Sequence, residues 1–327
     1  MAGTQYTNSV AYLLSQQWLE ADAAGYINEV LYGVSPMGII PIVPTSHFMR
    51  DEYFTRGVNS TKLTQKRKLN EMPDATSGNP FKKNTEHTSI YFRRTDIDTR
   101  LAKERPGAYD EMLLADAKDM VMDIDYDIFN GVVDSTGYGL SGLKDRIAIG
   151  SSYDVNNAGV LTINTSATTM KTFLRKFREA RDLIKMAPGM NLVAFCNKRI
   201  HRAITSGRDE LGANVAGFGY MDILNNRVTT IDDVPLLKLE GDSVNTQTLA
   251  FDENGESSTS MFICGIGGAP AEGSKEKPNG LVIVSSDQVI DKETAKVLGQ
   301  IQTKQEMDIG LRVPAGSVAR LSRLKDV

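Results

Sequence analysis

The sequence predicts an α+β protein in which helices and strands are mixed without regular alternation. Two segments, 108–132 and 166–187, have clear helical periodicity. After residue 190 the chain changes to short apolar runs separated by glycine, proline and polar residues, which is typical of strands and turns. Because helices do not follow each strand at a regular interval, the pattern argues against a doubly wound parallel sheet.

The composition is that of a folded protein, with 41% hydrophobic and 24% charged residues. The net charge of −4 does not suggest a dedicated nucleic-acid binder, which usually carries a basic domain, but it leaves room for a surface that encloses DNA. Cys196 and Cys264 lie in apolar stretches, so we expect buried, reduced thiols and a reducing compartment. The sequence has no apolar run of the ~18 residues that a membrane helix needs, and its start does not resemble a signal peptide.

The first hundred residues predict a partly helical start at 9–32 and then an irregular stretch with three prolines. Residues 58–71 and 88–101 read as two extended segments separated by a region rich in proline and glycine, which predicts a long hairpin. Neither segment is apolar enough to bury a face well. Because a lone two-stranded hairpin is only marginally stable in water, we expect this hairpin to be mobile or to lie on another surface.

The strongest predicted helix spans residues 108–132. Its apolar side chains recur at spacings of three and four residues. After the second helix, at 166–187, we expect a buried strand at 191–196, a short helix at 198–206, and strands within 227–231, 234–240, 248–252, 260–266 and 280–286. The tail predicts a final hairpin, with one strand at 296–313, a turn at 314–316 and a second strand at 317–324.

Three sequence patterns that could indicate a cofactor or metal site occur without the structural context that such a site requires. Residues 137–142 match a dinucleotide-binding glycine pattern, but they follow a helix, where the motif requires a strand. Asp123, Asp125 and Asp127 resemble the opening of a calcium loop, but they lie inside a helix and lack its glycine. No histidine has a partner at metal-ligand spacing; the histidines are His47, His87 and His201. We therefore expect no catalytic residue, no cofactor and no metal.

The distribution of charge is the most informative feature of the sequence. Between Thr61 and Arg105 there are eleven bases and six acids, whereas Tyr109 to Asp127 holds seven acids and one base. Four of these acids fall on one stripe of the predicted helix, and like charges at this spacing cost a few tenths of a kcal/mol per pair. Two interpretations remain open. The stripe is a solvated face beside a mobile basic loop, or a basic segment lies along it.

If the basic segment cannot reach its own helix, a neighbouring copy of the chain supplies it, and such a contact repeats into rings or a lattice. The predicted contact residues of the extended loop are Lys62, Lys66, Arg67, Lys68, Arg93 and Arg94. Those of the helix are Asp116, Asp119, Asp123 and Asp127.

The order of these parts resembles the major capsid proteins of tailed bacteriophages, which have the Hong Kong 97-type capsid fold. Residues 173–204 resemble the helix, strand and short helix that enter the axial domain of that family. Residues 227–240 resemble its strand with an aspartate-x-x-proline turn, here Asp232, Val234 and Pro235, and residues 310–324 resemble its closing strands. The resemblance covers nearly the whole chain.

The resemblance implies an N-terminal arm (1–45), an extended loop and its base (46–105), a peripheral domain with a long spine helix (106–187), an axial domain (188–294) and return strands of the peripheral domain (295–327). It also implies hexamers and pentamers that form an icosahedral head around double-stranded DNA, which the shell contacts non-specifically. Scaffolding, portal and decoration proteins are possible partners, with assembly in the bacterial cytoplasm, presence in the virion and no membrane. A cellular nanocompartment shell of the same fold is the alternative, and a soluble enzyme with a spatially assembled site is a third.

Overall fold

The structure is a computed structural model. It describes residues 35–44, 50–56, 81–87, 89–104, 106–133, 139–156, 159–164, 166–186, 189–211, 218–223, 226–239, 241, 247–255, 257–267, 280–285, 291–297 and 299–326.

The body of the protein is built on a seven-stranded mixed sheet in the spatial order β5-β14-β10-β6-β9-β8-β7. Strands β5 and β14 are parallel, as are β6 and β9, and the other neighbours are antiparallel. Every residue of β10 is buried, which requires layers on both faces of the sheet. The strands are β5 (Leu161–Ile163), β6 (Met190–Asn197), β7 (Phe218–Ile223), β8 (Asn226–Ile231), β9 (Val234–Leu239), β10 (Thr259–Gly267) and β14 (Val318–Asp326).

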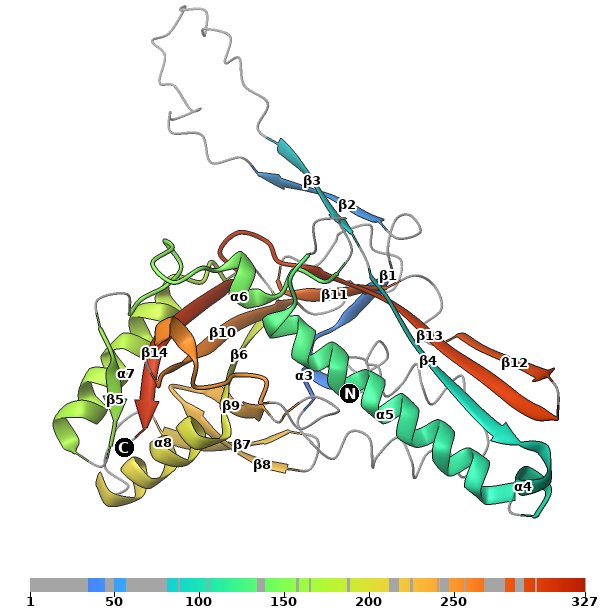
Figure 1. The fold of residues 1–327 in the computed structure, drawn as a ribbon. Helices are drawn as coiled ribbons and strands as arrows, with labels where there is room; N and C mark the ends of the chain where they lie inside the picture. Colours follow the sequence, from blue (N-terminus) through green and yellow to red (C-terminus); the bar gives the residue numbers. More distant parts are fainter. Residues whose placement is uncertain are drawn as a thin grey trace, which may run out of the picture.

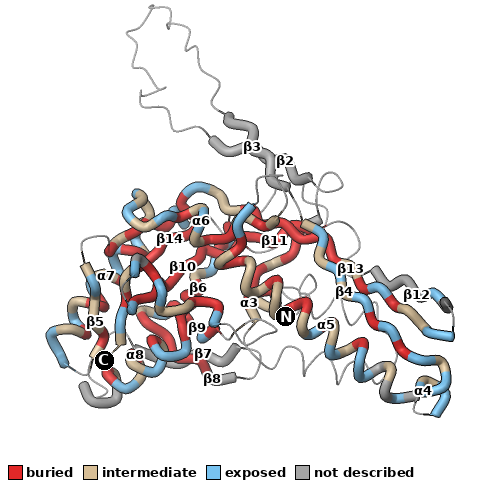
Figure 2. The backbone as a smooth tube through the Cα atoms, viewed as in Figure 1, coloured by how far each residue is buried: buried red, intermediate tan, exposed pale blue. Residues whose placement is uncertain are grey.

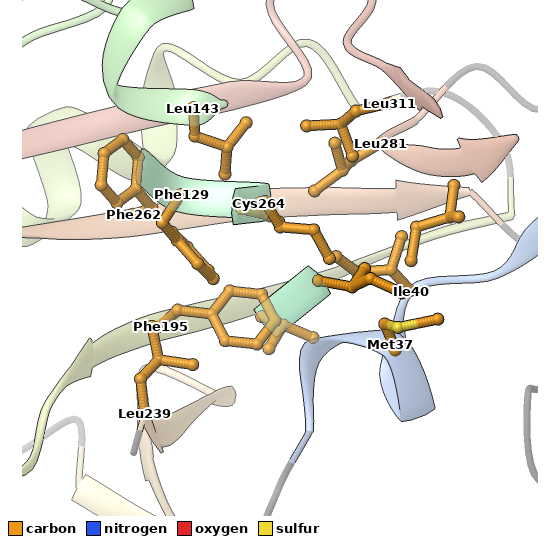
Figure 3. Packing of buried hydrophobic residues seen from close by; sticks show 14 of the residues in the cluster. Met37, Ile40, Phe129, Leu143, Phe195, Leu239, Phe262, Cys264, Leu281 and Leu311 are labelled. Carbon is orange, nitrogen blue, oxygen red and sulfur yellow. The ribbon is translucent and has the colours of Figure 1, made fainter. Parts of the chain in front are cut away.

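Helices α7 (Ala167–Asp182) and α8 (Lys198–Leu211) cover one face of this sheet (Figure 1). The C-terminal half of α5 (Pro106–Asn130) packs on the other face. The alternation of side chains along β6 explains this arrangement, since Val193 and Phe195 point into the core beneath α5, whereas Ala194 and Cys196 point into the core beneath α7 and α8. Figure 3 shows the first of these cores, where the Phe129 ring lies 5.5 Å from that of Phe195.

A second sheet begins beside the body and carries a long extension away from it (Figure 1). Its strands follow the order β1-β11-β13-β12, and β4 pairs with β13 over ten residue pairs. The extension consists of β4, β12, β13, the short helix α4 and the N-terminal half of α5. The bounds are β1 (Ile42–Pro44), β4 (Ser89–Asp98), α4 (Thr99–Glu104), β11 (Val282–Ser285), β12 (Asp291–Val297) and β13 (Gln300–Arg312).

Residues 35–44 are part of the core. They form the short helix α3 (Pro36–Ile39) and strand β1, which pairs in parallel with β11. Met37, Ile40 and Ile42 are at most 4% exposed and belong to the core beneath α5. The end of the segment assigned from the sequence to an N-terminal arm is therefore held inside the body.

Several sequence predictions are confirmed. The long helix predicted at 108–132 is α5, the helix at 166–187 is α7, the strand at 191–196 is β6 and the short helix at 198–206 is α8. Val132 lies beyond the end of α5 and is 69% exposed. Both cysteines are buried, as expected, and burial raises the pKa of both thiols.

The predicted pairing of 58–71 with 88–101 needs correction. The second segment does form a strand, β4, but β4 pairs with β13, and residues 57–80 lie outside the described residues. A separate two-stranded sheet is formed by β2 (Arg50–Arg56) and β3 (Phe81–His87), which extend away from the body (Figure 1). The predicted helical start at 9–32 also lies outside the described residues.

The predicted final hairpin is wrong. Strands β13 and β14 are joined by the expected turn, but they belong to different sheets and do not pair. Val318 to Ser322 are all buried, because alternate side chains of β14 enter the cores on the two faces of the large sheet, Val318 in one and Ala319 and Leu321 in the other. The hairpin partner of β13 is β12, through a turn at Gly299, whose φ of +82° favours glycine. Residues 248–252, predicted as a strand, form a turn followed by a bend and are not in a strand.

The domain bounds expected from the sequence stay a prediction. In the structure β14 lies in the same sheet as β6, β9 and β10, and helix α7 covers one face of that sheet.

Candidate functional site

The candidate site is the layer between β4 and α5 in the extension. Along β4, exposed residues alternate with less exposed ones, as Figure 2 shows. Tyr91, Arg93 and Thr95 point toward α5, whereas Phe92 and Arg94 point away from it. The odd-numbered side chains of β4 can therefore reach the helix.

Each of these three side chains donates a hydrogen bond to an aspartate of α5. The Tyr91 hydroxyl donates to Asp127 Oδ2 at 2.8 Å. Arg93 Nη2 donates to Asp123 Oδ2 at 3.1 Å and lies 4.0 Å from Asp119 Oδ2. The hydroxyl of Thr95 donates to the carboxylate of Asp116.

The spacing of these contacts follows from the geometry of a strand that runs antiparallel to a helix. Two residues advance a strand by ~6.7 Å, and four residues advance a helix by ~6 Å. Tyr91 and Arg93 therefore meet successive turns of α5, at Asp127 and Asp123, whereas Thr95 meets Asp116, two turns before Asp123. The four aspartates are neutralised or hydrogen-bonded along this face, which offsets the mutual repulsion that their spacing creates.

Electrostatics fix the protonation state at one end of this layer. Burial, and then the nearby carboxylate of Asp127, raises the pKa of the Tyr91 hydroxyl above its usual range. Tyr91 therefore remains a hydrogen-bond donor at neutral pH.

Strand β13 holds α5 from the same side. Gln305 Nε2 donates to the backbone oxygen of Leu113 at 3.2 Å, and the hydroxyls of Tyr109 and Thr303 share a hydrogen bond. The N-terminal half of α5 is therefore bound to both β4 and β13, which stiffens the extension.

The structure thus brings together five of the predicted contact residues, Arg93 and the four aspartates, within one chain. Arg94 lies on the opposite face of β4, where its Nε donates to Asp96 at 2.9 Å. A role of these residues between subunits stays a prediction. The other predicted loop residues lie outside the described residues: Lys62, Lys66, Arg67 and Lys68.

Sequence reasoning missed the partner of Asp125, although it placed this residue away from the acidic stripe. The Ser35 hydroxyl donates to Asp125 Oδ2 at 2.5 Å, and the Met37 backbone N–H donates to Oδ1 at 2.9 Å. Burial raises the pKa of this carboxyl to about 7. An aspartate on the inner side of a helix was the available signal, but its partner lies 90 residues away in the sequence.

A second polar cluster that the sequence did not reveal braces the centre of the body. Arg320 of β14 donates through Nη2 to Glu253 Oε1 and through Nη1 to the Ile147 backbone oxygen, both at 2.8 Å. Ser260 of β10 donates to the second oxygen of Glu253 at 2.6 Å. Glu253 lies in a short 3-10 helix (Glu253–Gly255), and Ile147 follows α6 (Leu143–Arg146). The cluster therefore ties the connection after α5 to the large sheet.

Within the described part of the chain, no group of three or more His, Cys, Asp or Glu side chains is arranged to hold a metal ion. Among the described helices, none is long and apolar enough to cross a membrane.

The fold is shared with known shell proteins, although no protein-family model and no curated protein sequence matches this sequence. The holo-SrpI encapsulin complex from Synechococcus elongatus PCC 7942 is similar with a TM-score of 0.60 and 11% identity, covering 90% of each chain. The capsid of a native GTA particle gives 0.55 and 9%, covering 87% of this chain and 88% of the other. The mature capsid of bacteriophage PhiM1 gives 0.52 and 9%, covering 88% and 85%.

At these identities the likeness shows the fold. The chain has the Hong Kong 97-type capsid fold, which confirms the fold expected from the order of its parts. The bounds of its domains are not set by the likeness.

Proposed function

We propose that this chain is the major capsid subunit of a tailed bacteriophage, which assembles as hexamers and pentamers into an icosahedral head around double-stranded DNA. The observation that carries the proposal is the extent of the likeness. Three shell-forming chains each match 87–90% of this chain with TM-scores of 0.52 to 0.60. A match over the whole architecture supports shared assembly more strongly than a match to one sheet would.

The extension gives the subunit a means to reach its neighbours. Helix α5 has 25 residues, so it spans roughly 37 Å at ~1.5 Å per residue. β4 and β13 bind one side of it. On the opposite face of β4, Phe92 is 65% exposed and Ile90 is 37% exposed. Exposed apolar side chains on a stiff extension favour a contact with a second copy of the chain.

The β2–β3 pair favours a second contact between subunits. A two-stranded sheet is marginal by itself in water, so another surface should support it. The connection between these strands, residues 57–80, carries four bases and two acids, including Lys66 and Arg67. A head-to-tail contact of this kind, repeated around an axis, closes into a ring.

The experiment is sedimentation of the purified full-length chain, followed by negative-stain electron microscopy of each fraction. The proposal expects rapidly sedimenting round particles of uniform size, or tubes and sheets with the same lattice. A discrete oligomer of six or fewer subunits at every protein concentration would contradict it.

A nanocompartment shell that holds cargo enzymes is the second candidate. The observation that favours it is the TM-score of 0.60 to an encapsulin, over 90% of both chains. Particles purified from the producing cell distinguish the two. Nuclease-protected double-stranded DNA inside them supports the phage head, whereas a co-purifying enzyme without DNA supports the compartment.

A further inference from the structure

Helix α8 presents a basic face on the outside of the large sheet. Ile200 and Ile204 are fully buried against the sheet, so the opposite side of the helix faces solvent. Lys198 and Arg202, one turn apart, are exposed there, and Lys238 of β9 is exposed as well. The register of β9 with β6 places Lys238 beside Cys196, on the face of the sheet that α8 covers.

Two further bases on this side of the large sheet are paired with acids. Arg199 forms two hydrogen bonds with Asp326, at 2.9 and 2.8 Å, and Arg178 of α7 forms two with Asp232. In the part of the chain that the structure describes, no acid lies within ion-pair distance of Lys198, Arg202 or Lys238. The two acids of α8 are in its last turn. This basic face stands out against a chain whose net charge is −4.

The half-buried side chain of His201 lies near Lys238. Burial, followed by the positive charges of Lys238 and Arg208, lowers its pKa. The imidazole is therefore neutral at neutral pH, and the uncompensated charge comes from lysine and arginine. Because these groups stay charged throughout the physiological range, the face remains basic at any pH that the protein meets.

The chemistry of the face favours a phosphate backbone over a protein partner. Protein interfaces usually centre on buried aromatic or aliphatic anchors. Among the described residues, none of the large exposed apolar side chains lies on α8 or β9. A polar, basic surface without such an anchor is typical of contacts with nucleic-acid backbones.

We propose that the α8–β9 face, formed by Lys198, Arg202 and Lys238, binds the phosphate backbone of double-stranded DNA without regard to sequence. This inference rests on the proposed capsid function, in which one surface of the shell must meet the enclosed DNA. The face would then be turned toward the interior of the particle.

The test compares two full-length variants with equal changes of charge. The first is Lys198→Glu with Arg202→Glu. The control is Lys103→Glu with Lys118→Glu, two exposed lysines of α4 and α5 that have no acid partner among the described residues. Fluorescence anisotropy measures the binding of unassembled subunits to two 30-base-pair duplexes of unrelated sequence, over a series of salt concentrations. Electron microscopy records separately whether each variant forms shells.

We expect the α8 variant to lose roughly tenfold or more in affinity for both duplexes equally, and the slope of log affinity against log salt to fall by about 2. The control should retain the wild-type slope. Equal losses in both variants, or none in either, overturn the proposal. It is also overturned if the α8 variant binds DNA normally but fails to assemble or loses a protein cargo, since the face then serves a protein contact. Absence of shells from the wild-type chain contradicts the capsid function, whatever the DNA measurements give.

Discussion

Arg93 and Asp123, thirty residues apart in the sequence, are joined across the layer between β4 and α5 by a hydrogen bond of 3.1 Å. Both side chains are about one-third exposed, at 35% and 36%. At this exposure water screens the pair, so its net contribution to stability is small, about 0.2–1 kcal/mol. The pair instead helps to set the register between β4 and α5, that is, which turn of the helix faces which residue of the strand.

A double-mutant cycle on Arg93→Met and Asp123→Asn should give a coupling energy of about 0.5 kcal/mol in urea unfolding of unassembled subunits. The matched control is Arg94→Met, on the opposite face of β4, combined with Asp123→Asn. That pair shares no contact in the structure, so its cycle should close to zero. Equal coupling in both cycles would contradict the assignment of Arg93 to the helix-facing side.

Charge reversal in the loop at 57–80 tests the proposed contact between subunits. Lys66→Glu with Arg67→Glu should raise the protein concentration needed for assembly severalfold, because the basic loop would then meet a neighbour with the wrong sign. Folding of the isolated subunit should not change. The measurement is the sedimenting fraction as a function of protein concentration. Assembly at the wild-type concentration would show that the charges of Lys66 and Arg67 make no contact between subunits that assembly needs.

The carboxyl of Asp125 should make stability depend on pH. Its pKa in the folded protein is about 7, raised from 3.8 by burial, so the folded chain holds this proton more tightly than the unfolded chain does. Between about pH 4 and pH 7 the folded state binds more protons. The stabilising contribution is therefore complete below about pH 4 and is lost as pH rises toward 7, at no more than ~1.4 kcal/mol per pH unit.

Asp125→Asn should remove this dependence while keeping the side-chain shape that meets Ser35 and Met37. The check is the free energy of unfolding from urea titrations at pH 5, 6, 7 and 8, compared between the variant and the wild type. An unchanged difference between them at all four values would show that Asp125 is ionised throughout in the folded protein.

Alanine substitutions at two glycines, Gly142 after α5 and Gly107 in its first turn, should change stability in opposite directions. A Cβ on Gly142 would lie 2.7 Å from the backbone nitrogen of Gly131 and 2.8 Å from the backbone oxygen of Asp127, and backbone atoms cannot move aside cheaply. Gly142→Ala should therefore destabilise the subunit by roughly 2 kcal/mol or more. At Gly107 a Cβ would meet nothing within 4 Å, so Gly107→Ala should stabilise α5 by about 0.5 kcal/mol. Thermal unfolding of both variants measures the contrast.

Local patterns in the sequence predicted the helices well and the strand pairings poorly. The periodicity of 108–132 identified α5 because its apolar residues repeat every turn, and the acidic stripe was visible for the same reason. No comparable local sequence pattern identifies which strand a given strand will pair with. β13 and β14 are adjacent in sequence and are joined by a turn, yet each pairs within a different sheet, β13 with β4, β11 and β12, and β14 with β10 and β5.

The same limit applies to the candidate site. The sequence predicted which aspartates share a face, but it could not show that β4 of the same chain would meet them. Contacts such as Asp125 with Ser35 or Arg320 with Glu253 join residues that are 90 and 67 positions apart. Such contacts depend on the assembled fold, so only the structure reveals them.

Electron cryomicroscopy of the particles formed by the full-length chain tests the proposed capsid function. We predict closed shells in which copies of this chain form hexamers and pentamers, with the extension of each subunit lying against its neighbour. A discrete small oligomer with no lattice, or a shell in which the extension contacts no second copy, would contradict it.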